Sequence, residues 1–341
     1  MKNQKGIVFV GNILTDHIKI ITDYPKEGML TNIIGTSNSV GGCVPNTSIN
    51  LAKIDNDISI SVCGLVGNDE DGRFVTAEMK KYGIDTSGIK ISDDSQTSYS
   101  DAMSVESTGA RTFFHHRGAN RKFSPADIDL DSLNCEILHI GYILLLDEFD
   151  REDSEYGTVM ARFLKNVQEK GIKTSIDVVS DTSEAFKQKV VPALKYCNYA
   201  IMNEIEGGGA TGIEARRPDG SIDVENIKTI LSNLMEYGVK DMAVIHCPEA
   251  GFSMTQDGEF TVVPSLNLPK GFIKGSCGAG DAFCAGCLYG VYRGLLAKEI
   301  LEFASGAAAC NLTESDAITG MKTKHEITKM SNNMERLKLV L

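Results

Sequence analysis

The sequence predicts an α/β protein of three layers, in which helices cover both faces of a mostly parallel sheet. Short apolar runs alternate with stretches of helical periodicity along most of the 341 residues. Strands are expected at residues 6–14, 58–67, 136–145, 173–180, 199–203 and 241–247. Helices are expected at residues 71–83 and at about 154–170, 184–196 and 224–237. Because a helix joins each strand to the next, the strands run parallel between two helical layers.

Two segments break this alternation, at about residues 14–40 and 97–118. Both resemble strands joined by turns, and ESTGAR (residues 106–111) is a plausible hairpin loop. Neither has the pattern of a fully buried strand, so we expect a small separate sheet. This sheet is either a lid over a pocket or an extension of the main sheet's edge. No linker rich in proline or glycine divides the chain, which favours a single domain over residues 1–341 with an attached lid.

Composition excludes several classes of protein. The net charge of −12 argues against nucleic-acid binding, which normally requires a basic face. It does not argue against an anionic substrate, because a metal ion and a few backbone amides can bind phosphate locally. The N-terminal apolar run is too short for a signal peptide, and no stretch has the length of a transmembrane helix. Nine cysteines without a secretory signal suggest reduced thiols in the cytoplasm.

The segment CAGC (residues 284–287) forms a C-x-x-C pattern within an expected helix. The two thiols share one face of that helix, so zinc binding or redox chemistry is one interpretation. The other is that small residues let the helix pack closely against the sheet. We favour close packing, because no second ligand pair at zinc-finger spacing is present.

The segment GAGD (residues 278–281) opens this helix and is the first candidate for chemistry. Glycine lets backbone N–H groups converge on an anion, and the positive end of the helix dipole points to the same place. This arrangement suits phosphoryl transfer, in which the N–H groups stabilise charge and Asp281 accepts a proton from the attacking hydroxyl. The structural alternative is an aspartate that caps a helix behind a flexible turn.

Two further motifs precede GAGD along the chain. GGCVPN (residues 41–46) places two glycines before Asn46, and NEIE (residues 203–206) follows an expected strand. In this order and at these separations, the three motifs resemble those of the ribokinase-like (PfkB) carbohydrate kinase family. The segments 64–72 and 303–317 resemble further parts of the family pattern. The resemblance covers nearly the whole chain and implies the ribokinase-like form of the α/β/α fold.

The resemblance implies an ATP-dependent transfer of the γ-phosphate to a hydroxyl of a monosaccharide or related sugar. It makes Asp281 the catalytic base, beside an anion hole of Gly278, Ala279 and Gly280. The ATP phosphates would be contacted by Asn203, Ser276, Gly278 and Gly280, and Mg²⁺ with its waters by Asn203 and Glu206. The sugar would be contacted by Asp16, Gly42 and Asn46. The structural alternatives are a turn cap at Asp16, a helix cap at Asn46 and a solvated Glu206.

Two positions, Gly275 and Cys43, depart from the family pattern, and a third, Asp69, is expected to be structural. Gly275 stands where the family often has an aspartate that helps to hold a monovalent cation, which argues against activation by potassium. Cys43 replaces a lysine found in ribokinase itself, which weakens ribose as the substrate. Asp69 is expected to cap the helix that follows it and to be mainly structural.

Other activities remain as alternatives. A nucleoside or a keto-deoxy sugar acid could be the substrate, with Arg117 gripping a carboxylate, although a solvated role is favoured for Arg117, His115 and His116. GGGATG (residues 207–212) satisfies the dinucleotide fingerprint, but it does not turn directly from a strand into a helix. An NAD(P)-dependent oxidoreductase therefore remains only as an alternative to the kinase. A non-catalytic sugar- or nucleotide-binding protein is disfavoured by the presence of Asp281.

The lid also predicts an assembly. Its apolar surface, contributed by Ile18, Ile20, Phe113 and Phe114, is larger than one substrate pocket would cover. In the family such lids often pair with a second copy, which shields the sugar from water. We therefore expect a homodimer through the lids, and a monomer whose lid folds onto its own domain is the alternative.

Overall fold

A computed structural model describes residues 5–179 and 185–339 of the chain. The last residue of the strand expected at 173–180 and the first of the helix expected at 184–196 lie outside the described residues. None of the helices in the described part of the chain combines the length and the apolar character that crossing a membrane requires.

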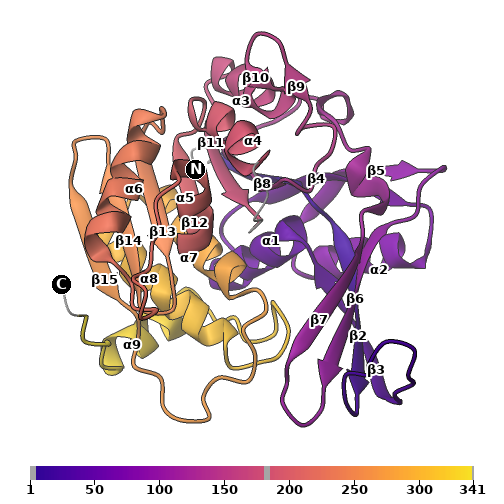
Figure 1. Ribbon diagram of the computed structural model, residues 1–341. Coiled ribbons are helices and arrows are strands. Elements are labelled where there is room, and N and C mark those ends of the chain that lie inside the picture. Colours follow the sequence, from indigo (N-terminus) through magenta and orange to yellow (C-terminus); the bar gives the residue numbers. More distant parts are fainter. Residues whose placement is uncertain (1–4, 180–184, 340–341) are drawn as a thin grey trace.

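The main sheet has nine strands in the order β15-β14-β13-β12-β11-β8-β1-β4-β5 (Figure 1). Their bounds are β1 (Gly6–Gly11), β4 (Ile60–Gly67), β5 (Asp85–Ser92), β8 (Cys135–Ile143), β11 (Lys173–Val178), β12 (Tyr199–Asn203), β13 (Met242–His246), β14 (Ala250–Thr255) and β15 (Phe260–Pro264). Neighbouring strands from β5 to β13 pair in parallel, and β14 and β15 add two antiparallel strands at one edge. The prediction of a mostly parallel sheet is confirmed.

Helices cover both faces of this sheet, as alternate residues of β1 illustrate. Val8 and Val10 pack in one core, whereas Ile7 and Phe9 pack in the other. The first core includes residues of α3 (Val159–Glu169), α4 (Ala185–Leu194), α5 (Glu204–Thr211) and α6 (Val224–Glu236). The second includes residues of α1 (Cys43–Ile54), α2 (Glu70–Lys81), α7 (Ala279–Arg293), α8 (Ala297–Asn311) and α9 (Lys324–Asn333). The three-layer architecture is therefore confirmed.

One helix begins later than expected, and the glycine run that matched the dinucleotide fingerprint lies in a helix that was not predicted. The helix expected from residue 154 begins only at Val159, because the short hairpin β9 (Glu152–Asp153) and β10 (Gly157–Thr158) precedes it. The glycine run of GGGATG lies inside α5 instead of forming a turn between a strand and a helix. A Cβ on Gly207 would lie 2.5 Å from Cδ1 of Ile245, so glycine lets α5 approach β13 closely. This glycine run therefore serves helix packing.

A separate sheet of four strands stands beside the main one, in the order β3-β2-β6-β7 (Figure 1). Its strands are β2 (Leu14–Ile21), β3 (Ile33–Gly41), β6 (Ser98–Val105) and β7 (Arg111–His116). The strand expected over residues 6–14 is split, because β1 ends at Gly11 and β2 begins at Leu14. Gly11 has a φ of +130°, and a Cβ there would lie 1.8 Å from the Gly141 carbonyl oxygen. The chain thus leaves the main sheet and enters the lid within two residues.

The lid is anchored to α2. The Asp69 carboxylate caps this helix by accepting a hydrogen bond from the Gly72 N–H at 2.9 Å, as predicted. It also accepts bonds from the N–H of Thr97 at 2.7 Å and from its hydroxyl at 2.6 Å, just before β6 begins. His17 Nε2 of β2 lies 3.0 Å from Oδ1 of Asp71. These contacts fix the orientation of both inner lid strands.

The two faces of the lid differ from our expectation in one respect. Strand register aligns Ile18 with Ala102, and Ala102 with Phe113, in one row of side chains. Ile20 lies on this face, two residues from Ile18, whereas Phe114 lies on the opposite face because neighbouring residues of a strand alternate. Phe113 and Phe114 are each 52% exposed. The apolar face therefore consists of Ile18, Ile20 and Phe113, without Phe114.

Candidate active site

Two cavities meet at the GAGD segment, where the carboxyl ends of the parallel strands lie. The first, of about 590 Å³, is lined by the lid, by the ends of β8, β11, β12 and β13 and by the start of α7. The second, of about 650 Å³, is lined by the start of α7, by α8 and by residues 265–268. Both include Asn203, His246 and Gly280 in their lining. In open α/β sheets, ligands bind beyond the carboxyl ends of the strands, so this is the candidate active site.

Every residue to which the family resemblance assigned a catalytic or binding role lines one of these cavities. The lid-side cavity is lined by Asp16, Gly42, Asn46, Asn203, Glu206, Gly278, Gly280 and Asp281. The other cavity is lined by Asn203, Ser276, Ala279 and Gly280. The fold therefore brings together the three motifs, which lie far apart in the sequence.

Asp281 is buried and accepts hydrogen bonds from three side chains. The Asn46 amide donates to Oδ2 at 2.9 Å, while Tyr142 donates to Oδ1 at 2.7 Å and Thr47 to the same oxygen at 3.5 Å. Burial raises the pKa of Asp281 to about 6, and the three donors limit the rise. The carboxylate is therefore mostly ionised at neutral pH and can accept a proton.

Asp281 lies in the first turn of α7, and Gly278 occupies the cap position. Gly278 has a φ of +73°, and a Cβ there would lie 2.3 Å from Cβ of Ala317. A Cβ on Gly280 would meet only the His246 ring, at 3.5 Å, so it would project into space that the two cavities share. The Ala279 N–H donates to the Ser276 carbonyl at 3.3 Å. The N–H groups in the first turn of a helix form an anion site of the kind that phosphates occupy.

Asn203 and Glu206 form a reciprocal capping box at the start of α5. Asn203 Oδ1 accepts from the N–H groups of Ile205 and Glu206 at 2.9 Å, and Glu206 Oε2 accepts from the Asn203 N–H at 2.8 Å. The Asn203 amide also donates to Glu206 Oε1 at 2.7 Å. Glu206 is only 5% exposed, so it is not the solvated residue of the structural alternative.

Three residues that line the lid-side cavity belong to none of the sequence motifs. Tyr142, Asp177 and His246 lie at or near the carboxyl ends of β8, β11 and β13. Burial raises the pKa of Asp177 well above its usual range, and the charges of Glu206 and Asp281 raise it further. A polar residue at the end of a buried parallel strand is the signal that would have identified all three.

The lid contributes polar side chains to the same cavity. Asp16 pairs in register with Ser100, and the Ser100 hydroxyl lies 3.0 Å from Nδ1 of His115. Burial raises the pKa of Asp16 to about 7, although the nearby charge of Arg111 lowers it. Arg117 does not line the cavity and instead forms an ion pair with Asp147. This position favours the structural interpretation of Arg117, whereas His115 does line the cavity.

The α/β fold places two neighbouring cavities at the N-terminus of α7, an arrangement that suits a phosphotransferase. Residues 4–324 match the model of the pfkB family of carbohydrate kinases. The chain belongs to this family and is a sugar kinase of the ribokinase type.

The chain is similar over nearly its whole length to several known kinases. It is 23% identical over 327 residues to the ribokinase of Schizosaccharomyces pombe, covering 94% of this chain and 96% of the relative. It is 22% identical over 340 residues to the 5-dehydro-2-deoxygluconokinase of Bacillus subtilis, covering 95% of each. The structure of Arabidopsis thaliana ribokinase complexed with ribose and ATP matches with a TM-score of 0.79 at 20% identity, covering 96% of this chain and 99% of that one.

The Tyr142 hydrogen bond predicts a shift in pH dependence. A base is lost as pH falls through its pKa, so kcat/KM should decrease below about pH 6. Replacing Tyr142 by Phe removes a donor that favours the charged carboxylate, and such a bond is worth about 1.5 kcal/mol, or about one pKa unit. The acidic limb of the Tyr142→Phe profile should therefore move to higher pH by about one unit. Tyr99→Phe, in the lid away from Asp281, is the control. An unmoved limb in Tyr142→Phe, or an equal shift in Tyr99→Phe, would contradict the role of this bond.

Proposed function

We propose that the protein transfers the γ-phosphate of ATP to a hydroxyl of a neutral monosaccharide, with Asp281 as general base. The observation that carries this proposal is the position of Asp281 in the lining of the lid-side cavity, with a pKa of about 6, in the first turn of α7, where the second cavity begins at Gly280. The sugar would occupy the lid-side cavity, and ATP the cavity beside α8. Each substrate would then reach the first turn of α7 from its own side.

In this mechanism the sugar hydroxyl attacks the γ-phosphorus as the bond to the β,γ-bridging oxygen breaks. The hydroxyl proton passes to Asp281, and ADP leaves with the bridging oxygen. N–H groups in the first turn of α7, among Gly278, Ala279 and Gly280, stabilise the charge on the transferred group, and Ser276 contacts the ATP phosphates. The protein supplies alignment and charge stabilisation, and Asp281 supplies the proton acceptor.

Asp16, Gly42 and Asn46 would hold the sugar. Asn46 donates through its amide nitrogen to Asp281, whereas its buried Oδ1 has no hydrogen-bond partner within the described structure. A buried amide oxygen without a partner costs free energy, and a sugar hydroxyl would satisfy it. The same side chain would thus orient the base and locate the hydroxyl that the base deprotonates.

Asn203 and Glu206 would organise Mg²⁺ and its waters beside the phosphates. Carboxylate and amide oxygens are the protein groups that suit Mg²⁺, which retains several waters when it binds. Both residues line the lid-side cavity together with Asp281, and Glu206 is buried without losing access to it. When bound, Mg²⁺ would neutralise charge on the phosphate oxygens.

The charge of the cavity favours a neutral sugar over a sugar acid. Among the described residues that line the lid-side cavity, four are carboxylates (Asp16, Asp177, Glu206 and Asp281), and none is lysine or arginine. A substrate carboxylate would meet no cationic side chain in this lining and would be repelled by the ionised Asp281, since buried like charges interact strongly. This holds although the Bacillus subtilis relative is named a kinase of a keto-deoxy sugar acid.

A substrate panel tests this preference. We expect ADP release with ATP and a neutral pentose or hexose to exceed that with sugar acids or nucleosides by at least about tenfold in kcat/KM, because a difference of 1.4 kcal/mol corresponds to that factor. Higher kcat/KM with a keto-deoxy sugar acid would contradict the charge argument while leaving Asp281 as the base. Oxidation of NAD(P)H without ADP release would overturn the proposed reaction.

Replacing Asp281 by Asn tests the base. General-base catalysis contributes about 10²- to 10⁴-fold, so turnover should fall by that range while ATP binding and the circular dichroism spectrum are retained. Asp147→Asn, at an exposed carboxylate outside both cavities, should keep near-normal turnover. Near-normal turnover of Asp281→Asn would exclude this residue as the base.

Replacing Glu206 by Gln tests the metal role. Loss of the carboxylate charge should raise the Mg²⁺ concentration for half-maximal activity by about tenfold or more. The exposed Glu214→Gln is the control. Identical Mg²⁺ titrations of the wild type and Glu206→Gln would make Glu206 only the partner of Asn203 in the capping box.

We propose that two copies pair through the apolar lid face of Ile18, Ile20 and Phe113. The same face carries Asp16 toward the cavity, so a second copy would close the cavity from above and exclude water. An apolar face exposed to water is typical of a surface that binds another protein chain, which favours such pairing.

Light scattering across a concentration series tests the dimer. We expect about twice 36.9 kDa for the wild type, and a monomer for Phe113→Asp, because a buried unpaired charge opposes association. Phe114→Asp places the same charge on the opposite face of the same strand and should remain dimeric. A wild type of 36.9 kDa at all concentrations with full activity would exclude the lid dimer.

We also propose a cytoplasmic location. All nine cysteines are free, and all except Cys277 are buried. Free thiols persist in reducing compartments, which supports this assignment.

A further inference from the structure

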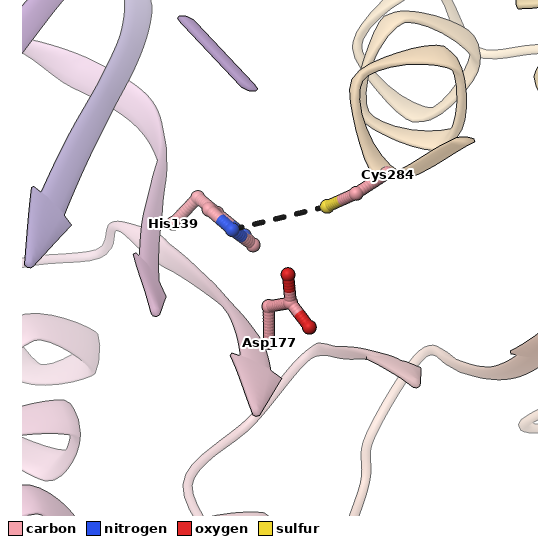
Figure 2. Close-up of side chains that lie close together, drawn as sticks. All are labelled: His139, Asp177 and Cys284. Carbon is pink, nitrogen blue, oxygen red and sulfur yellow. Dashed lines mark hydrogen bonds between the residues drawn. The ribbon is translucent and has the colours of Figure 1, made fainter. Parts of the chain in front are cut away.

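Three potential metal ligands lie together beneath the candidate active site. His139 of β8, Asp177 of β11 and Cys284 of α7 point toward one shared space (Figure 2). All three are buried, and one nitrogen, one oxygen and one sulfur atom lie within 4.8 Å of one another. The phosphoryl transfer proposed above assigns no role to any of them. We propose that this cluster binds one zinc ion or a similar divalent transition metal.

One edge of the cluster is close in length to an edge of a tetrahedral zinc site. His139 Nε2 lies 3.8 Å from Sγ of Cys284. Bond lengths of about 2.0 Å for Zn–N and 2.3 Å for Zn–S place these atoms roughly 3.5 Å apart in a tetrahedron. A shift of a few tenths of an ångström in either side chain would therefore complete this edge of the site.

His139 is held in an orientation that suits a metal ligand. Its Nδ1 lies 3.0 Å from the buried Ser175 hydroxyl. When Nδ1–H donates to Ser175, the lone pair of Nε2 faces Cys284, which is how outer hydrogen bonds commonly orient metal-binding histidines.

The ligand types distinguish this site from the proposed magnesium site. Thiolate and imidazole suit zinc, whereas Mg²⁺ requires oxygen ligands. A bound dication would also be attracted by the carboxylates that line the lid-side cavity, Glu206 and Asp281. Asp177 lines the lid-side cavity, which gives the metal an entry path and a water for the fourth position.

Such a metal would tie the main sheet to the helix that carries the base. β8 and β11 are neighbours in the sheet, and Cys284 follows Asp281 by about one turn of α7. The second cysteine of the C-x-x-C pattern, Cys287, does not belong to the cluster although it is also buried. The pattern itself is therefore not the ligand pair, and Cys287 provides a matched control on the same helix.

Titration of the full-length, reduced and metal-free protein with Co²⁺ tests the site. We expect one equivalent to bind and to produce the charge-transfer band of a single thiolate ligand, together with the visible bands of tetrahedral cobalt. Zn²⁺ should abolish both signals by displacement, whereas excess Mg²⁺ should leave them unchanged. The melting temperature should rise when Zn²⁺ is added, because a ligand that binds the folded state stabilises it.

Variants assign the ligands. Loss of an outer hydrogen bond weakens metal binding by about 10- to 100-fold, so Cys284→Ser should weaken it by more than about 100-fold and remove the thiolate band. Cys287→Ser should keep both. Absence of the band in the wild type, or equal losses in the two variants, would overturn the proposal. If Cys284→Ser does not fold by circular dichroism, Ser175→Ala should retain the band with affinity about 10- to 100-fold lower, and unchanged affinity would contradict the orienting bond.

Discussion

A buried carboxylate with three hydrogen-bond donors is the constraint on which the active site depends. Asp281 lies away from water, and a charge in that position requires partners. Its donors come from α1 (Asn46 and Thr47) and from the end of β8 (Tyr142), so three distant segments must meet at one point. Close packing of small residues makes this possible. A Cβ on Gly286 of α7, for example, would lie 2.6 Å from Cα of Ala304 in α8.

Both sheets contribute walls to the lid-side cavity. The main sheet and α7 hold the groups proposed for phosphoryl transfer, whereas the lid strands bring Asp16, Ser100 and His115 to the opposite wall of the cavity. The two sheets are connected most directly through β1 and β2, which follow one another with only Asn12 and Ile13 between them. Asp16 is thus positioned relative to the main sheet by a very short length of chain.

Much of this arrangement could be predicted from the sequence, because its signals are local. Apolar runs and helical periodicity predicted the parallel sheet. The order of the three motifs predicted which residues lie around Asp281. Tyr142 and Asp177 could not be found in this way, because their proximity to Asp281 depends on how β8 and β11 align. The register between β8 and β11 shifts between Ile176 and Val178, and no local sequence pattern predicts this shift. The faces of the lid were likewise fixed by register, which separates Phe113 from Phe114.

Gly42 and Gly118 lie where the chain passes between the lid and the main part of the molecule. Their packing affects how a sugar can enter the lid-side cavity. A Cβ on Gly42 would lie 2.5 Å from the Asn12 carbonyl oxygen, and one on Gly118 would lie 2.7 Å from that of Gln96. The backbone at both crossings therefore packs closely against neighbouring backbone, although both glycines have left-handed φ values, +87° and +45°. A rotation of the whole lid about these points would disturb both contacts. We therefore expect the outer strand ends to move more readily than the base of the lid when a sugar enters.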